Sequence, residues 1–297
     1  MVENISKEQY KIIKEIGSGS FGKVYKAEDM KSKQTFAIKK IKKQDLEYNE
    51  YLKEAFDKEL ECMKRCECAN SVKLIDYFQT QTHHNIVMEL CDTDLEFILN
   101  KTVNGFSEDD VKIILRQLYN VFHIMDRENI IHRDLKLRNI MIKYLENTST
   151  SSSSLINFVS KLSDFGFSKV MDEDITKTKL GTPATMAPEI LNNKHYTKKA
   201  DIWSLGVITY QLLFKTLPFK ARNEKELLSL INNSKGLRIP DEKKISEALE
   251  DLLRNMLQIN PDYRLSWKQY FEHPFFNFKE SINKVRLFLI FSLILSI

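Results

Sequence analysis

The amino-acid sequence predicts an α+β protein of two lobes: a small amino-terminal lobe with an antiparallel sheet and one helix, and a larger, mostly helical lobe. Two patterns carry this prediction. Apolar and polar side chains alternate between residues 10 and 40, which is typical of strands. Beyond residue 92 the apolar residues recur at three- and four-residue spacing, which is typical of helices. The two lobes are therefore expected to cover residues 10–91 and 92–276.

In the small lobe, glycines at positions 17, 19 and 22 predict that the first hairpin turns at a glycine-rich loop. The apolar spacing predicts a helix over residues 50–65. Two strand-like runs follow at residues 72–78 and 85–91, and we expect them to complete the sheet.

In the large lobe, Ser107 and the three acidic residues after it mark a helix start, because a hydroxyl cap and first-turn carboxylates suit the exposed N–H groups there. Further helices are predicted over residues 200–214 and 245–257. Residues 145–158 form a Ser/Thr-rich insert that is too polar to pack. We expect it to be a loop between two short strands.

The composition is that of an ordinary soluble globular protein, with 42% hydrophobic and 29% charged residues. The formal net charge is +4 without a long single-sign run, so nucleic acid is not an expected partner. Cysteines stand at positions 62, 66, 68 and 91, but no further CxxC or His-x-x-x-His pair completes a zinc site. We expect reduced thiols and, with no signal visible in residues 1–14, a cytoplasmic location.

Residues 1–9 are expected to be an extension and residues 277–297 a tail. The tail ends in the apolar run LFLIFSLILSI at 287–297, which as a helix would rise about 16 Å against the ~30 Å hydrocarbon core of a bilayer. The run is too short to span a membrane, and we expect it to lie outside the fold. A partly inserted anchor giving peripheral membrane association, a helix packed on the domain and a mistaken gene end are open alternatives.

Four motifs carry the chemistry. They are GSGSFGKV at 17–24, FAIK at 36–39, HRDLKLRN at 132–139 and DFG at 164–166. They occur in the order of the protein-kinase signature set, and together they are very improbable by chance. The chain therefore resembles a eukaryotic protein kinase of the serine/threonine type, roughly over residues 8–278.

The glycine motif alone would also allow a dinucleotide-binding site. That site needs a helix directly after the glycines and an acidic residue about twenty positions on. Here the chain continues as a strand, and the residue twenty positions after Gly19 is Lys39. The motif therefore favours a loop that covers nucleotide phosphates.

The resemblance implies a site for ATP. Lys39 would bond the α- and β-phosphates, with Glu59 as the best candidate partner and Glu54 and Glu61 as weaker ones. The implied nucleotide-binding residues are Ile16, Gly17, Gly19, Ser20, Gly22, Val24, Ala37, Lys39, Met88, Glu89, Cys91, Asp94 and Met141. For Met88, in the gatekeeper position, and Met141, below the adenine, plain core packing is expected as well.

The resemblance also implies the catalytic groups. Asp134 would accept the proton of the substrate hydroxyl or orient it, and Lys136 would neutralise the transferring phosphoryl group. Asn139 and Asp164 carry oxygen donors suited to Mg²⁺, or to Mn²⁺ in its place.

Further residues are implied to hold the site in shape or to regulate it. Glu189, in the Ala-Pro-Glu motif, would pair with Arg264, and Asp201 would brace the catalytic loop. Arg133 would engage a phosphate on Thr178 first and Thr176 second, added by an upstream kinase. The residues implied to have these roles are Arg133, Thr176, Thr178, Glu189, Asp201 and Arg264.

Lys136 and Gly-Thr-Pro at 181–183 match kinases that act on Ser and Thr of protein substrates. Leu137, where proline is commonest, and Ala184-Thr185 depart from the usual pattern without removing a catalytic group. Short motifs around positions 87–91 and 185–189 are most similar to the autophagy-initiating unc-51-like kinases. The calcium/calmodulin-dependent group is the near rival, although no calmodulin-binding basic helix follows the domain.

Two other functions compete with protein phosphorylation. A pseudokinase, which keeps the fold and acts as a binding scaffold, would show degraded motifs, whereas every catalytic residue type is present here. A small-molecule kinase is disfavoured by the Ala-Pro-Glu region, which serves as a platform for peptides.

Overall fold

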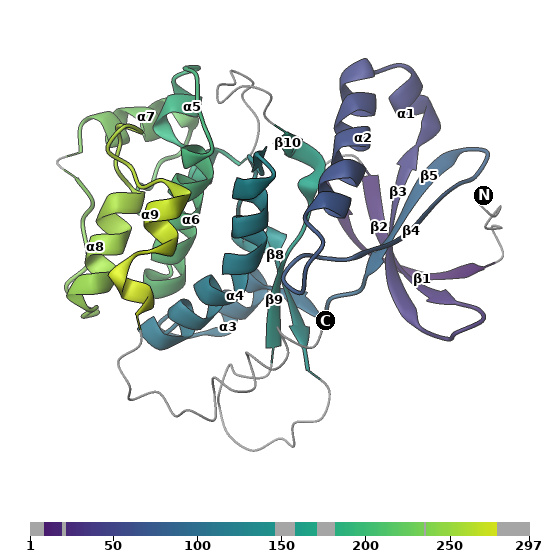
Figure 1. Cartoon of the computed structure of the whole chain (residues 1–297), viewed down its shortest axis with the longest axis horizontal. Coiled ribbons are helices and arrows are strands. Elements are labelled where there is room, and N and C mark those ends of the chain that lie inside the picture. The colour runs from purple at the N-terminus through teal and green to yellow at the C-terminus, as the bar shows by residue number, and fades with distance from the viewer. Residues whose placement is uncertain (1–8, 20–21, 146–157, 171–181, 235, 278–297) are drawn as a thin grey trace.

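The computed structural model describes residues 9–19, 22–145, 158–170, 182–234 and 236–277. These residues form two lobes that lie side by side in Figure 1, one built on a sheet and the other on helices. The α+β, two-lobed prediction is confirmed.

The small lobe contains a five-stranded antiparallel sheet in the order β1-β2-β3-β5-β4. Its strands are β1 (Tyr10–Gly19), β2 (Gly22–Asp29), β3 (Thr35–Lys42), β4 (Leu74–Gln79) and β5 (His83–Glu89). Gly19 pairs with Gly22, so the glycine-rich motif lies where β1 and β2 of the first hairpin end and begin. This is the arrangement that the sequence predicts.

Helix α2 (Glu50–Arg65) packs on this sheet after the short helix α1 (Lys43–Glu47). The side chain of Asn49 accepts a hydrogen bond from the Leu52 N–H and caps the helix. Its buried residues are Ala55, Phe56, Glu59, Cys62 and Met63, followed by Cys66 just after the helix. This one-sided spacing places the carboxylate of Glu59 in the middle of an apolar stripe.

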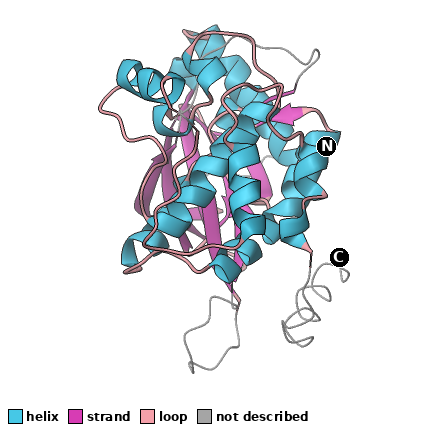
Figure 2. Ribbon diagram, turned by 90° about the vertical axis from the view of Figure 1, so that its left-hand side faces the viewer, coloured by secondary structure: helices cyan, strands magenta, loops and turns pink. Residues whose placement is uncertain are grey.

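The large lobe is mostly helical. Its helices are α3 (Leu95–Lys101), α4 (Glu108–Arg127), α5 (Pro188–Leu191), α6 (Lys199–Phe214), α7 (Glu224–Asn232), α8 (Glu247–Met256) and α9 (Trp267–Phe271). Ser107 and Asp110 form a capping box at the start of α4, as the acidic first turn suggested. Helix α6 is buried on almost every side and forms the centre of the lobe. Figure 2, seen from the large-lobe side, shows helices in front of the strands.

Short strands and turns line the boundary between the lobes. A three-stranded sheet has the order β6 (Thr93–Asp94), β8 (Ile140–Tyr144), β9 (Phe158–Leu162), and β7 (Ile130–Ile131) pairs with β10 (Lys169–Val170). The 3₁₀ turns are η1 (Leu137–Asn139), η2 (Phe165–Phe167), η3 (Pro183–Thr185) and η4 (Pro274–Phe276). Tyr144 pairs with Phe158, so the Ser/Thr-rich insert leaves and re-enters the domain between two strands. Residues 146–157 themselves lie outside the described residues.

One hydrophobic core runs from α2 through the large lobe, and a small second cluster of Ala27, Ile38 and Val87 lies within the sheet of the small lobe. Within the part of the chain that the structure describes, no helix has the length and apolar content needed to cross a bilayer. The apolar run 287–297 is not among these residues.

Candidate active site

Lys39 and Glu59 form a buried ion pair between β3 and α2. The Lys39 Nζ atom lies 2.6 Å and 2.8 Å from the two carboxylate oxygens of Glu59. Lys39 is 3% exposed and Glu59 is 1% exposed. The lysine stem is therefore held in one position, with the partner that the sequence favoured over Glu54 and Glu61.

Asp164 brings a second carboxylate to the same lysine, with Oδ1 at 3.5 Å from Nζ. Burial pulls the pKa of Lys39 down, but attraction to Glu59 and Asp164 outweighs burial and the pKa is raised. Burial raises the pKa of the Glu59 carboxyl, and the charge of Lys39 opposes that rise. The lysine is therefore held as a fixed positive charge next to the Asp-Phe-Gly segment.

The catalytic loop holds Asp134 with donors on both carboxylate oxygens. The Lys136 Nζ atom donates to Oδ2 at 2.6 Å, and the Thr182 hydroxyl donates to Oδ1 at 2.8 Å. The Asn139 amide donates to the Asp134 carbonyl at 2.8 Å. Asp134 is 2% exposed, so its carboxylate is fixed in place by these contacts.

Asp201, on α6, fixes the backbone just before Asp134. Its Oδ2 accepts from the His132 N–H at 2.7 Å and its Oδ1 accepts from the Arg133 N–H at 3.0 Å. Burial raises the pKa of Asp201, and these hydrogen bonds oppose the rise. Arg133 has a φ of 67°, a conformation that costs about 1–3 kcal/mol outside glycine. The two hydrogen bonds from Asp201 stabilise this turn of the loop.

Asn139 and Asp164 are brought together through Ser163. The Ser163 N–H and hydroxyl donate to the Asn139 carbonyl at 2.9 Å and 3.1 Å. Among the described residues, no three His, Cys, Asp or Glu side chains gather into a metal site. Two protein oxygen ligands suit a cation such as Mg²⁺ that is bound jointly with phosphate and water. The residues therefore fit a metal that arrives with a nucleotide.

The residues expected to contact adenine come from both lobes. Ala37 and Met88 are register partners in β3 and β5, and Met141 pairs with Asp94 across β8 and β6. Asp94 also caps α3 by accepting from the Phe97 N–H at 2.9 Å, a role beyond the ribose contact that the resemblance implies.

Two further residues mark the segment between the lobes. The Glu89 carboxylate pairs with Lys161 at 3.0 Å, and the Glu89 N–H donates to the Lys73 carbonyl at 2.9 Å. Burial raises the pKa of the Cys91 thiol to about 12, which makes it a poor nucleophile.

Glycines of the loop between β1 and β2 have different structural roles. A Cβ atom at Gly22 would lie 2.2 Å from the Lys40 carbonyl oxygen, so only glycine allows β2 to approach β3 here. A Cβ at Gly17 would meet nothing within 4 Å. The neighbouring Ile16 is 43% exposed and Val24 is half-buried, whereas Ser20 lies outside the described residues, as do Thr176 and Thr178.

Glu189 and Arg264 form the second buried ion pair. The guanidinium donates to the two carboxylate oxygens at 2.6 Å and 2.8 Å and to the Gln258 and Lys199 carbonyls at 3.0 Å each. It also lies 5.1 Å from the centre of the Trp203 ring. This pair fixes the segment that follows the active site onto the core of the large lobe.

The contact of Thr182 with Asp134 was missed by sequence reasoning, which used Thr182 only as a marker of class. The two residues are 48 positions apart, and no local pattern links them. The position of Thr182 just before the Ala-Pro-Glu motif was the one available signal.

A glycine loop next to a buried lysine between two carboxylates, together with a fixed aspartate, is the arrangement of a nucleotide-dependent phosphotransferase. Comparison with known proteins agrees with this class. The family profile described as Protein kinase domain matches residues 10–276.

Individual relatives are serine/threonine kinases. The chain is 32% identical to serine/threonine-protein kinase atg1 of Dictyostelium discoideum over 273 residues, which cover 90% of this chain and 39% of that protein. It is 32% identical to serine/threonine-protein kinase ULK3 of Xenopus laevis over 271 residues, 90% of this chain and 55% of that protein. It is also 32% identical to calcium/calmodulin-dependent protein kinase type II of Schizosaccharomyces pombe over 289 residues, 90% of this chain and 57% of that protein.

The chain therefore belongs to the protein kinase family, in its serine/threonine class. Both groups that the sequence resembles occur among these relatives. The chain spans between 39% and 57% of the length of the three proteins. Members of this family use ATP with a divalent metal ion.

Proposed function

We propose that this chain transfers the γ-phosphate of ATP to serine and threonine hydroxyls of protein substrates. The observation that carries the proposal is the intact pair of Lys39 and Glu59 beside Asp164, since a lysine held in this way can position the nucleotide phosphates. A scaffold without catalysis would not need three buried or part-buried charged groups in contact, because their desolvation lowers stability.

Each group then has one task. Lys39 binds the phosphates and Lys136 neutralises charge on the transferring group, while Asp134 orients the hydroxyl of the substrate and accepts its proton. The Thr182 hydroxyl donates to Asp134, and this contact supports the same carboxylate as the acceptor for a substrate hydroxyl. Asn139 and Asp164 would hold Mg²⁺, which supplies charge neutralisation at the phosphates.

Activation by phosphorylation is part of the proposal. We place the modification at Thr178 first and Thr176 second, with an upstream kinase as the donor enzyme. The support is Arg133, whose position next to Asp134 would couple a phosphate to the catalytic loop. Phosphopeptide mapping of the active protein tests this; if both threonines are unmodified, the activation proposal is wrong.

Transfer of labelled γ-phosphate from ATP tests the function itself. The assay compares the unaltered chain, Asp134→Asn and the control Asp241→Asn, an exposed aspartate of the large lobe. Transfer to Ser or Thr that is lost only in Asp134→Asn is the expected result. ATP binding without transfer, even after treatment with activating kinases, would favour the alternative function, a pseudokinase scaffold.

A further inference from the structure

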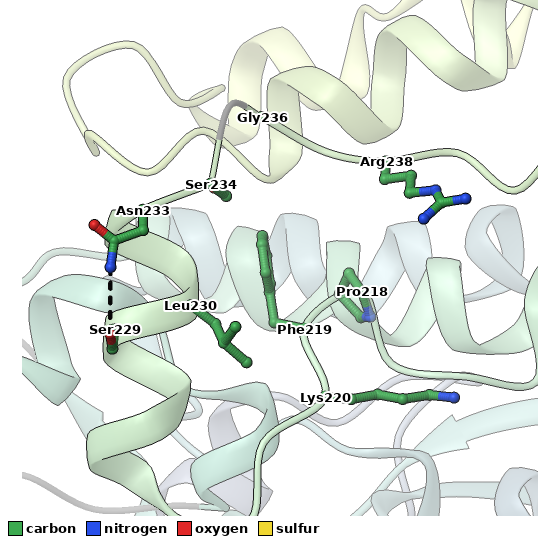
Figure 3. Close-up of a pocket in the computed structure, with 9 residues that line it drawn as sticks. All are labelled: Pro218, Phe219, Lys220, Ser229, Leu230, Asn233, Ser234, Gly236 and Arg238. Atoms are coloured by element: carbon green, nitrogen blue, oxygen red, sulfur yellow. Dashed lines mark hydrogen bonds between the residues drawn. The ribbon is translucent and has the colours of Figure 1, made fainter.

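A hollow of about 430 Å³ lies on the large lobe, between helix α7 and the loop that follows α6. Residues from three segments line it: Phe219 and Lys220 before α7, Leu230 in α7, and Ser234 and Arg238 after α7 (Figure 3). We call it the α7 hollow. None of the catalytic residues lines it, so its chemistry is separate from that of the active site.

The floor of the α7 hollow is apolar. Leu230 is 41% exposed and leaves apolar surface in contact with water. The Phe219 ring stacks on Trp203 with centroids 5.9 Å apart, and Trp203 also lies against Arg264. The floor is therefore linked through Trp203 to the buried ion pair of the large lobe.

The rim of the hollow is positive. Lys220 and Arg238 are exposed, and Figure 3 shows their side chains extending toward the same side. Among the described residues that line the hollow, none is acidic. A ligand that fits this surface has an apolar group for the floor and negative charge for the rim.

The hollow is connected to the active site through α7. This helix packs against η3, and Thr182, immediately before η3, donates to Asp134. A protein bound over α7 is therefore close to the segment at which the substrate hydroxyl is received.

We propose that the α7 hollow is a docking site for protein substrates, and that it binds an acidic segment containing a bulky apolar side chain. The apolar side chain lies on Phe219 and Leu230, and carboxylates of the segment pair with Lys220 and Arg238. The segment is distinct from the residue that is phosphorylated. This inference rests on the proposed function.

The test uses synthetic peptides. A fluorescent peptide with a central leucine among glutamates is titrated into the full chain, and its anisotropy reports binding without any catalysis. The same segment is then joined by a Gly/Ser linker, in either order, to a generic phosphoacceptor peptide. We expect the joined segment to lower KM about tenfold with kcat unchanged, and to lose this gain at high salt.

Three variants locate the site. Leu230→Ser, Lys220→Glu and Arg238→Glu should each abolish peptide binding and the KM gain, while phosphorylation of the generic peptide is unchanged. Lys225→Glu is the matched control, because Lys225 is exposed on the same helix but does not line the hollow. It should behave as the unaltered chain.

Other results would overturn the docking proposal. Binding that survives all three variants would place the acidic segment elsewhere. A normal rate on the generic peptide with no binding of the acidic segment would reject docking and leave the proposed function standing. A dimer that only the three variants dissociate would make the hollow an interface between two copies. Failure to phosphorylate any peptide would instead contradict the proposed function.

Discussion

Among the residues that the structure describes, two buried ion pairs have the same short distances but different surroundings. Lys39 and Glu59 are 2.6 Å and 2.8 Å apart, as are Arg264 and Glu189. The arginine donates to two backbone carbonyls as well and lies against the Trp203 ring. The lysine has Asp164, a second carboxylate, at 3.5 Å.

The difference shows how a stabilising pair is distinguished from a functional one. Around Arg264 the planar guanidinium is matched to its acceptors, which are parts of the protein itself. Around Lys39, two carboxylates share one ammonium, so a metal ion at Asp164 or a phosphate at Lys39 changes the charge balance. Burial and distance are similar in the two pairs, whereas the surplus of carboxylates around Lys39 favours the catalytic role proposed for that pair.

The largest effect expected from this comparison is on activity. Lys39→Met should slow phosphoryl transfer about a thousandfold, corresponding to about 4 kcal/mol in the barrier, because the phosphates lose their fixed cation. The melting temperature should fall as well, because the Glu59 carboxyl loses its buried partner. Steady-state rates and thermal unfolding measure the two quantities. A rate within tenfold of the unaltered chain would contradict the assignment.

The second largest effect is a loss of stability with activity retained. Arg264→Met should lower the free energy of unfolding by about 3–5 kcal/mol, because the Glu189 carboxylate is left buried without a partner. Urea unfolding measures this loss, and the rate per folded molecule should stay near that of the unaltered chain. The double variant with Glu189→Leu should recover much of the stability. If Arg264→Met were as stable as the unaltered chain, the Arg264–Glu189 pair would not be needed for stability.

Glycines of the phosphate-covering loop allow a third comparison. Gly22→Ala should destabilise the small lobe by about 1–3 kcal/mol, because the new methyl group would collide with the Lys40 carbonyl. Gly17→Ala meets no protein atom and should leave the melting temperature unchanged while weakening ATP binding. Calorimetric titration with ATP and thermal unfolding separate the two. If Gly17→Ala and Gly22→Ala lost stability equally, the two glycines would not have the different roles described here.

The smallest effect concerns pH. His84 accepts a hydrogen bond from the Tyr77 hydroxyl at 2.6 Å, if that ring nitrogen is unprotonated, and packs against Phe56 of α2. Burial, with the nearby charge of Lys43, lowers the pKa of His84, while Asp57 and Glu47 oppose this. The unfolded chain therefore binds the proton more readily than the folded chain.

Stability from His84 is then complete above its ordinary pKa of about 6.5 and falls as the pH drops below that value. His84→Gln should reduce this loss, as measured by the melting temperature between neutral and mildly acidic pH. His83→Gln is a second variant that should act in the same direction, because the pKa of His83 is also lowered by burial and by Lys40 and Lys42. If the melting temperature of His84→Gln depended on pH as that of the unaltered chain does, His84 would not be the cause of the loss of stability at acidic pH.

The sequence predicted the elements with local signals well and their edges less well. The helix over 50–65 is correct because its apolar stripe and cap are local features. The strand predicted at 72–78 begins instead at Leu74, because the Val72 N–H donates to the Leu162 carbonyl of β9. The strand predicted to reach Cys91 ends at Glu89, since the Asp92 N–H bonds to the Ile142 carbonyl. These edges depend on partners far along the chain.

The same limit applies to the site. Motif order was enough to select Lys39 and Asp134, and the resemblance pointed to Glu59 on the next helix, which the structure pairs with Lys39. The catalytic roles of the three residues stay predictions. The Ser163 link between Asn139 and Asp164 and the capping role of Asp94 have no signature in the sequence. Such contacts depend on how loops from different elements meet, which periodicity and spacing do not describe.

The pairing of Tyr144 with Phe158 has a practical consequence for protein engineering. The two ends of the insert leave the domain at neighbouring positions, so a folded reporter whose own termini are close together can replace residues 146–157. Doubling the length of such a connection costs only about 0.6 kcal/mol. The β8–β9 hairpin is therefore a grafting point for a fluorescent or purification module that leaves both termini of the chain available for other fusions.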